Sequence, residues 1–75
     1  MKPGDVMVAT HHVSYGWKTI ASAWVPVNIA PGDLVLVVGV ALIRHVAAKR
    51  GQWLLVLHGS GCCWKQAEFF DVPPG

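Results

Sequence analysis

Short apolar runs, separated by glycine, proline, asparagine and serine, make up most of this chain of 75 residues. The runs are rich in valine, isoleucine, tryptophan and threonine, which favour β-strands. Two of them begin alike, because residues 3–5 and residues 31–33 both read Pro-Gly-Asp and precede aliphatic residues. A rigid turn followed by an acid that bonds local amides is typical of the entry into a strand. The pattern therefore predicts an all-β protein in which both Pro-Gly-Asp segments start a strand.

Turn residues divide the chain into predicted strands. Clusters of glycine, asparagine, serine and proline predict turns at residues 14–16, 28–32 and 59–61. Pro26 has no N–H to give a neighbouring strand, so the end of the second strand is expected at a sheet edge or in a loop. Residues 67–70, Ala-Glu-Phe-Phe, are predicted to form a short helical turn before the last strand. The predicted strands are residues 5–13, 17–27, 33–38, 52–58, 62–66 and 71–72.

Residues 40–50 fit two structures. They contain several good helix formers, and Gly51 follows where a helix C-cap would lie. Val40 and Leu42 can instead continue the preceding strand, with residues 48–51 as a type I turn closed by a glycine bulge. The next run would then pair back as a hairpin, and we favour this strand interpretation.

Size and composition predict one domain, residues 1–75, with a thin core. A chain of this length buries only about 60% of the surface that its unfolded form exposes. Hydrophobic residues make up 53% of the chain and charged residues 13%, which excludes a disordered chain. Short strands with frequent turns at this length predict a small closed barrel, since closure removes exposed edges. The surplus of apolar side chains predicts a protein partner or a homo-oligomer.

Charge and cysteine content bear on partners and location. The net charge is +2, and the six Lys and Arg are scattered, which gives only weak support for nucleic-acid binding. The two cysteines, Cys62 and Cys63, are adjacent, so a disulfide between them could not stabilise the core. Two reduced thiols are typical of a cytoplasmic protein. No signal peptide is recognisable, and the longest apolar run, residues 34–43, is about ten residues long where a membrane helix needs roughly 20. We therefore expect a cytoplasmic protein without a membrane span.

The residue types of metal and catalytic sites are present in unfavourable spacing. His11 and His12 are adjacent, as are Cys62 and Cys63, and adjacent residues of a strand point to opposite faces, so neither pair can chelate zinc. His58 could act as a base for one of the thiols, but no third orienting group and no oxyanion donor can be named. The sequence therefore predicts no metal, no cofactor and no catalytic residue.

Aromatic residues are the only feature rich enough to suggest recognition. Seven in a chain of this size are too many for the core to hide completely, and a rigid ring with a polar edge is a favoured anchor for a partner. They are Tyr15, Trp17, Trp24, Trp53, Trp64, Phe69 and Phe70.

Three segments, in this order, resemble the SH3-like barrel. APGDLVLVVG at residues 30–39 resembles the strand after the long first loop of that fold, and RGQWLLVLHG at residues 50–59 resembles the next strands, with Trp53 in the place of the family's tryptophan. KQAEFFDV at residues 65–72 resembles the helical turn that leads into the final strand. The resemblance covers residues 30–72 best and extends to short SH3-like proteins of tailed phages and mobile elements. It implies about five strands with a short helical turn before the last.

The resemblance also implies a function. An SH3-like module of this kind is expected to be a non-enzymatic interaction domain that binds a protein, or its own copy, through an exposed aromatic face. Trp53 and Phe70 are the first anchors that the resemblance implies, followed by Tyr15 and Trp17, because the first loop of the fold covers the same groove.

Two other functions stay open. A nucleic-acid-binding barrel similar to the KOW version of the fold would stack bases on exposed rings. A small enzyme built at an oligomer interface would resemble the plasmid-borne dihydrofolate reductases that share the fold. In the nucleic-acid-binding barrel, the residues expected to contact phosphates are Lys18, Arg44, Lys49, Arg50 and Lys65.

Overall fold

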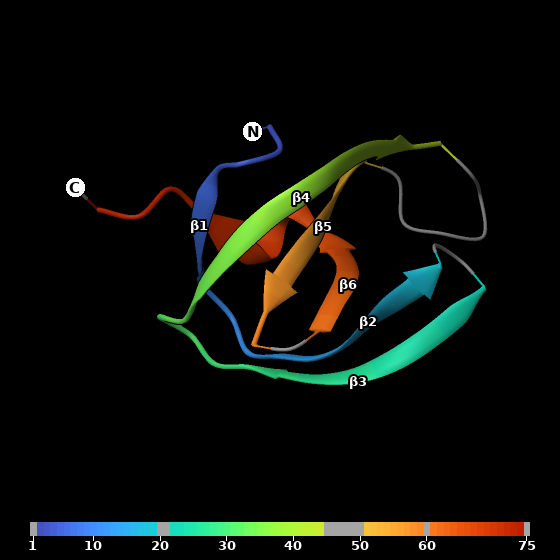
Figure 1. Cartoon of the computed structure of the whole chain (residues 1–75), viewed down its shortest axis with the longest axis horizontal. Coiled ribbons are helices and arrows are strands. Elements are labelled where there is room, and N and C mark those ends of the chain that lie inside the picture. The colour runs from blue at the N-terminus through green and yellow to red at the C-terminus, as the bar shows by residue number, and fades with distance from the viewer. Residues whose placement is uncertain (1, 20–21, 45–50, 60, 75) are drawn as a thin grey trace.

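The described part of the chain is all-β, as predicted. The computed structural model describes residues 2–19, 22–44, 51–59 and 61–74, and this part contains no α-helix (Figure 1). One 3₁₀ turn, η1, covers Ala67–Phe69 and confirms the helical turn expected before the last strand. The strands are β1 (Val6–Ala9), β2 (Val13–Thr19), β3 (Ala23–Ile29), β4 (Leu34–Ile43), β5 (Gly51–His58), β6 (Gly61–Gln66) and β7 (Phe70–Asp71).

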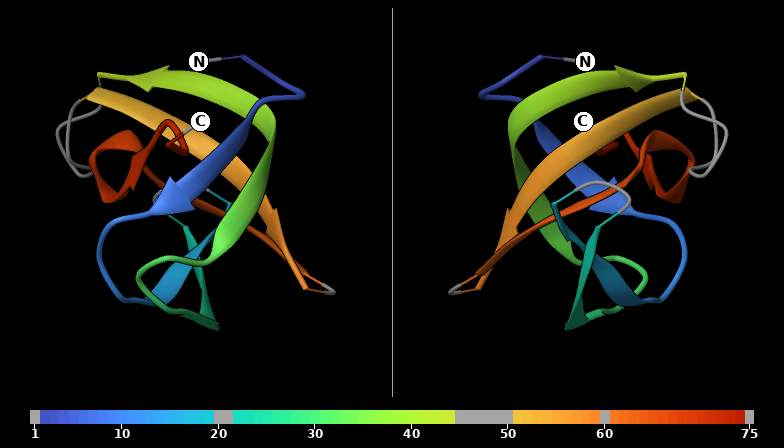
Figure 2. Two further views of the ribbon diagram at one scale, coloured as in Figure 1. Left: turned by 90° about the vertical axis from the view of Figure 1, so that its left-hand side faces the viewer. Right: turned by 90° about the vertical axis from the view of Figure 1, so that its right-hand side faces the viewer.

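The seven strands form one antiparallel sheet in the order β3-β2-β6-β5-β4-β1-β7. The first part of β4 pairs with β1 and its second part with β5, and the long strand curves between the two, as Figure 2 shows. Within the described residues, β3 and β7 each pair on one side only, so the sheet is open. The expected closed barrel of about five strands is therefore wrong in strand number and in closure. Pro26 in β3 and Pro73 after β7 lack the N–H groups that further pairing would need.

Most strand predictions after residue 33 are confirmed, and those before it are confirmed only in part. β5 and β6 match their predicted ranges closely, and β4 continues to Ile43, which supports the strand interpretation of that segment. Residues 45–50 lie outside the described residues. Pro26 lies in the edge strand β3, as expected.

The first half of the chain contains a hairpin that the pattern did not predict. The predicted strand 5–13 is interrupted, because β1 ends at Ala9 and β2 begins at Val13. Residues 14–16 belong to β2 and are not a turn. The predicted strand 17–27 is divided by a turn in which Ser22 N–H donates to the carbonyl of Thr19 at 3.0 Å. β2 and β3 pair along this hairpin.

The two Pro-Gly-Asp segments form the same turn, as predicted. Asp5 Oδ2 accepts the N–H of Lys2 at 3.1 Å, and Asp33 Oδ2 accepts the N–H of Ala30 at 3.0 Å. The backbone N–H of Asp5 donates in turn to the carbonyl of Lys2 at 3.2 Å, and that of Asp33 donates to the carbonyl of Ala30 at 3.0 Å. Gly4 has a φ of 97° and supplies the left-handed backbone that the turn needs.

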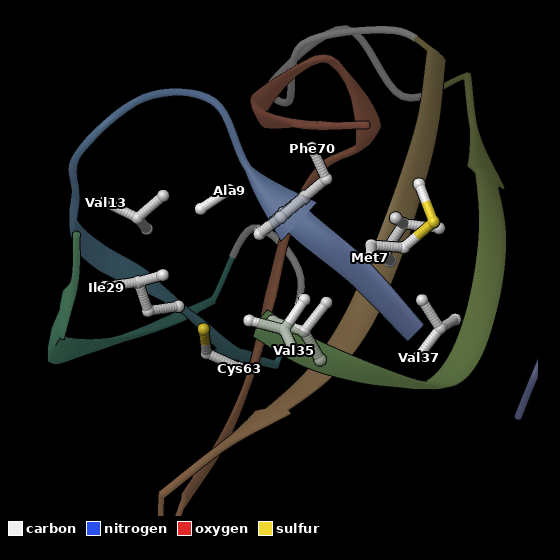
Figure 3. Packing of buried hydrophobic residues seen from close by; sticks show 10 residues of the cluster. Met7, Ala9, Val13, Ile29, Val35, Val37, Cys63 and Phe70 are labelled. Carbon is white, nitrogen blue, oxygen red and sulfur yellow. The ribbon is translucent and has the colours of Figure 1, made fainter. Parts of the chain in front are cut away.

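The core lies on the inner face of the curved sheet. Figure 3 shows its side chains gathered between β1, β4 and the start of the β2–β3 hairpin. Gly16 of β2 allows that hairpin to approach β6, because a Cβ there would lie 2.6 Å from the Sγ of Cys63. The buried cluster consists of Met7, Ala9, Val13, Ile29, Val35, Val37, Leu54, Val56, Cys63 and Phe70.

Candidate functional site

Three tryptophans form a row across the outer face of the sheet. Trp24 of β3 pairs directly with Trp17 of β2, and Trp17 pairs with Trp64 of β6. Directly paired residues lie on the same face of a sheet. That face is the outer one, because Trp64 is paired with Leu55, whose neighbours Leu54 and Val56 belong to the core. We call Trp24, Trp17 and Trp64 the aromatic row.

The β2–β3 end of the row is open to solvent. The side chain of Trp24 is 55% exposed, and its ring centroid lies 3.4 Å from that of Trp17. Tyr15, 48% exposed, meets Trp24 edge to face with ring centroids 4.8 Å apart. Tyr15 and Trp24 line a shallow, mostly apolar hollow. An exposed pair of rings in fixed mutual geometry is a suitable anchor for a partner, because little side-chain freedom is lost on binding.

The ring of Tyr15 packs against the ammonium group of a buried lysine, Lys65. The Nζ of Lys65 lies 4.0 Å from the ring centroid of Tyr15 and 4.6 Å from that of Phe69, and the residue is only 5% exposed. Loss of hydration lowers the pKa of Lys65 from its ordinary value, and the nearby Cys63 acts in the opposite direction. A cation between two ring faces is stabilised by their negative quadrupole, so Lys65 fixes the orientation of Tyr15.

The four anchors predicted from the sequence divide into two pairs. Tyr15 is exposed and Trp17 half-buried, and both belong to the surface just described. Trp53 is 2% exposed and Phe70 6%, so the structure does not offer their rings to a partner. Phe70 pairs with Ala9 and points into the core with it. Trp53 lies in the middle of the sheet, between Ala41 and Gln66.

Trp24, the most exposed tryptophan, was not among the predicted anchors. Its position depends on the hairpin that brings it opposite Trp17. A turn between residues 19 and 23 would have indicated this, since a hairpin turn there brings the residues on its two sides opposite each other, and a register shift between Trp17 and Thr19 makes Trp17 and Trp24 direct partners. The turn carries no glycine or proline in the sequence and therefore gave no signal.

Of the residues considered for phosphate contacts, the structure describes Lys18, Arg44 and Lys65. Lys65 is buried against Tyr15 and Phe69, which removes it from a nucleic-acid interface. Lys18 and Arg44 are exposed, on β2 and just after β4. Lys49 and Arg50 lie outside the described residues.

A second candidate site is a cavity of about 320 Å³ between β3 and the β5–β6 hairpin, lined by His58, Cys62 and Cys63 among others. His58 Nε2 lies 3.1 Å from Asp33 Oδ2, as in a base held by a carboxylate. Burial raises the pKa of the Cys63 thiol, with Cys62 acting in the same direction and Lys65 against it, so the thiol stays protonated and a poor nucleophile. Among the described residues, no three His, Cys, Asp or Glu side chains are grouped to hold a metal ion.

The turn at Asp33 predicts a measurable pH dependence. The N–H of Ala30 and, to a lesser extent, His58 hold the pKa of the Asp33 carboxyl below its ordinary value of 3.8, against an opposing effect of lost hydration. A lowered pKa in the folded state stabilises the fold above the unfolded pKa, and this contribution is lost as pH falls through the folded pKa. We expect the urea midpoint to fall between about pH 5 and about pH 2, and to fall less in Asp33→Asn.

Asp5 contributes in the same way and supplies the control. Lys2 lowers the pKa of Asp5 through hydrogen bonds and charge. The double variant Asp5→Asn, Asp33→Asn should therefore have the flattest profile. If Asp33→Asn loses as much stability in acid as the wild type, the turn hydrogen bond does not act on folding.

Comparisons with protein-family models, with curated protein sequences and with solved structures each give no match. In the described part of the chain, no helix is long and apolar enough to cross a membrane.

Proposed function

We propose that this protein is a non-enzymatic interaction module that binds a protein partner through the exposed rings of its β2–β3 hairpin. The observation that carries the proposal is the contact of Tyr15 with Trp24, two large rings that are each about half exposed and held edge to face. Aromatic residues of this kind are enriched among the anchors of protein interfaces. Trp17 and Trp64 continue the same surface toward the middle of the sheet.

The order of strand pairing supports an SH3-like origin for the module. Taken without the hairpin, the chain has five strands, β1, β4, β5, β6 and β7, with η1 before the last. The β2–β3 hairpin then occupies the place of the long first loop. This is the loop that, by the resemblance to the SH3-like fold, covers the partner groove, with Tyr15 and Trp17 on it.

A cross-linking experiment tests the proposal. A photoreactive phenylalanine analogue at position 15 should capture a protein from a bacterial lysate, and the same analogue at Leu42 should not. Leu42 is 62% exposed and lies on β4, away from the hairpin, which makes it a matched control for exposure. The adduct should be resistant to nuclease. An adduct removed by nuclease would indicate nucleic-acid binding instead, and equal capture from both positions would contradict a specific site.

Trp24→Ala should weaken binding of the captured partner by about 10- to 100-fold, because interface aromatic anchors typically contribute about 1.4–2.8 kcal/mol or more. Affinity is measured by calorimetry or anisotropy with the purified partner. Leu42→Ala should bind like the wild type. An unchanged affinity in Trp24→Ala would exclude the hairpin as the contact surface.

A further inference from the structure

A second apolar surface lies on the outer face of β1, β4 and β5, and the aromatic row does not include it. Val6, Leu36 and Leu57 pair directly with one another across these three strands and are 47%, 36% and 36% exposed. Leu34 and Val38 lie two residues to either side of Leu36 and are 59% and 39% exposed. Leu34 shares a face with Leu36 because alternate residues of a regular strand do. Val38 lies at a register shift between Val37 and Gly39, but it is exposed while Val37 is fully buried, so it points away from the core as Leu36 does. The five side chains therefore form a cross centred on Leu36. We call them the aliphatic face.

The strands beneath the aliphatic face carry almost no charge. β1, β4 and β5, which are described over their whole length, contain no Asp, Glu, Lys or Arg, and the one ionisable group is His58 at the end of β5. Asp71 of β7 pairs with Val8 on the outer side of β1, is exposed, and accepts the N–H of Val72. Other charged groups at the ends of the face contact partners within the chain. Lys2 lies 3.3 Å from Asp5, beside the start of β1, and His58 lies 3.1 Å from Asp33, beside the start of β4.

We infer that the aliphatic face docks against the same face of a second copy of this chain. A partner that brought charged side chains to this surface would leave them without water and without a counter-charge, which is costly. A second copy brings the same uncharged centre, and Asp71 lies beside β1 at the rim, so the centre of the contact buries no charge. Self-complementary contacts of this kind form dimers with two-fold symmetry.

The size of the surface indicates how tight the dimer is. The five side chains expose on the order of 400 Å², within the range of the largest apolar patches on small monomers. A stable interface buries about 800 Å² on each partner, so the aliphatic face supplies the apolar centre and about half of the area. An interface of this kind is typical of weak, transient association, and we expect the dimer to dissociate in the micromolar range. In the two-fold arrangement Leu36, at the centre of the cross, lies closest to the axis and faces its own copy.

Sedimentation of the purified chain tests the inference. Between about 5 µM and about 500 µM, the wild type should pass from its monomer mass of 8.1 kDa to about twice that mass. Leu36→Lys should stay monomeric over this range, because two ammonium groups would face each other across the axis. Leu42→Lys, on the same strand and 62% exposed, should dimerise like the wild type.

Two further variants keep the outcome decisive. If Leu36→Lys does not fold by circular dichroism, Leu34→Lys, at a more exposed position of the same face, should give a folded monomer. Trp24→Ala should leave the dimer intact, because β2 and β6 lie between β3 and the strands of the aliphatic face. A wild type that stays at 8.1 kDa at about 500 µM overturns the inference, as does a dimer that persists in both lysine variants. A dimer lost in Trp24→Ala but kept in Leu36→Lys would assign self-association to the aromatic row instead.

Discussion

Replacing Gly16 with alanine is expected to lower the melting temperature by about 4–24 °C, because there is no room for a side chain at this point of β2. A Cβ on Gly16 would lie 2.6 Å from the Sγ and 2.7 Å from the Cβ of Cys63, and 3.0 Å from the carbonyl oxygen of Trp64. The Cβ of Cys63 and the carbonyl oxygen of Trp64 are fixed to the backbone and cannot rotate away, so β2 and β6 must move apart. Overpacking of this kind costs about 1–3 kcal/mol, and each kcal/mol lowers the melting temperature of a domain of this size by about 4–8 °C.

Gly61 provides the matched control. It lies at the start of β6, is exposed, and has no left-handed φ, and a Cβ at this position would meet no other atom within 4 Å. Gly61→Ala should therefore melt within a few degrees of the wild type, as surface substitutions usually do. Thermal unfolding followed by circular dichroism measures both. Equal melting temperatures for the two variants would mean that the hairpin does not pack tightly on β6.

The same glycine shows where the sequence pattern failed. Ser14-Tyr15-Gly16 has the composition of a turn, but Gly16 serves a close approach between strands and the segment is part of β2. The true turn, between Thr19 and Ala23, contains no glycine or proline and was not recognised. A glycine can serve either purpose, and only the long-range pairing of β2 with β6 decides between them.

The second half of the chain was predictable because its turns carry their own chemistry. The Pro-Gly-Asp segment before β4 bonds its own amides, so the start of that strand carries a local signal in addition to its contacts with Ala9 and His58. β5 and β6 form a hairpin in which His58 pairs with Gly61, with glycines at both ends of the connection. Closure of the sheet would depend instead on pairing between its two edge strands, β3 and β7, which are far apart in the chain. Local turn signals carry no information about it.

The candidate site was predictable in kind and only partly in its residues. The excess of aromatic residues correctly indicated that some rings would lie at the surface, and Trp24 and Tyr15 do. Burial of Trp53 and Phe70 could not be derived from composition, because both follow from pairing with residues more than ten positions away in the chain. Assigning individual rings to core or surface therefore needed the register of the sheet.

Trp53→Ala is expected to lose about a third or more of the stability of the fold at 25 °C. Truncating a buried tryptophan costs about 3–5 kcal/mol, while a domain of this size has a total stability of only about 4–11 kcal/mol. Trp53 is 2% exposed and lies between β4 and β6 in the middle of the sheet, so few neighbours can move to fill the space. Urea unfolding followed by far-ultraviolet circular dichroism measures the loss without relying on tryptophan fluorescence.

Trp24→Ala separates this structural role from a binding role. Its ring contacts Trp17 and Tyr15 but is 55% exposed, so its removal should cost about 1 kcal/mol of stability, the size of an exposed aromatic pair. Trp53→Phe, which keeps a ring in the same space, should lose less stability than Trp53→Ala. A Trp53→Ala protein as stable as Trp24→Ala would show that the Trp53 ring is not needed by the fold, and would return it to the set of possible partner anchors. If Trp53→Ala is less stable than Trp24→Ala, Trp53 belongs to the core, and the rings left for partner recognition are those of the β2–β3 hairpin and Trp64.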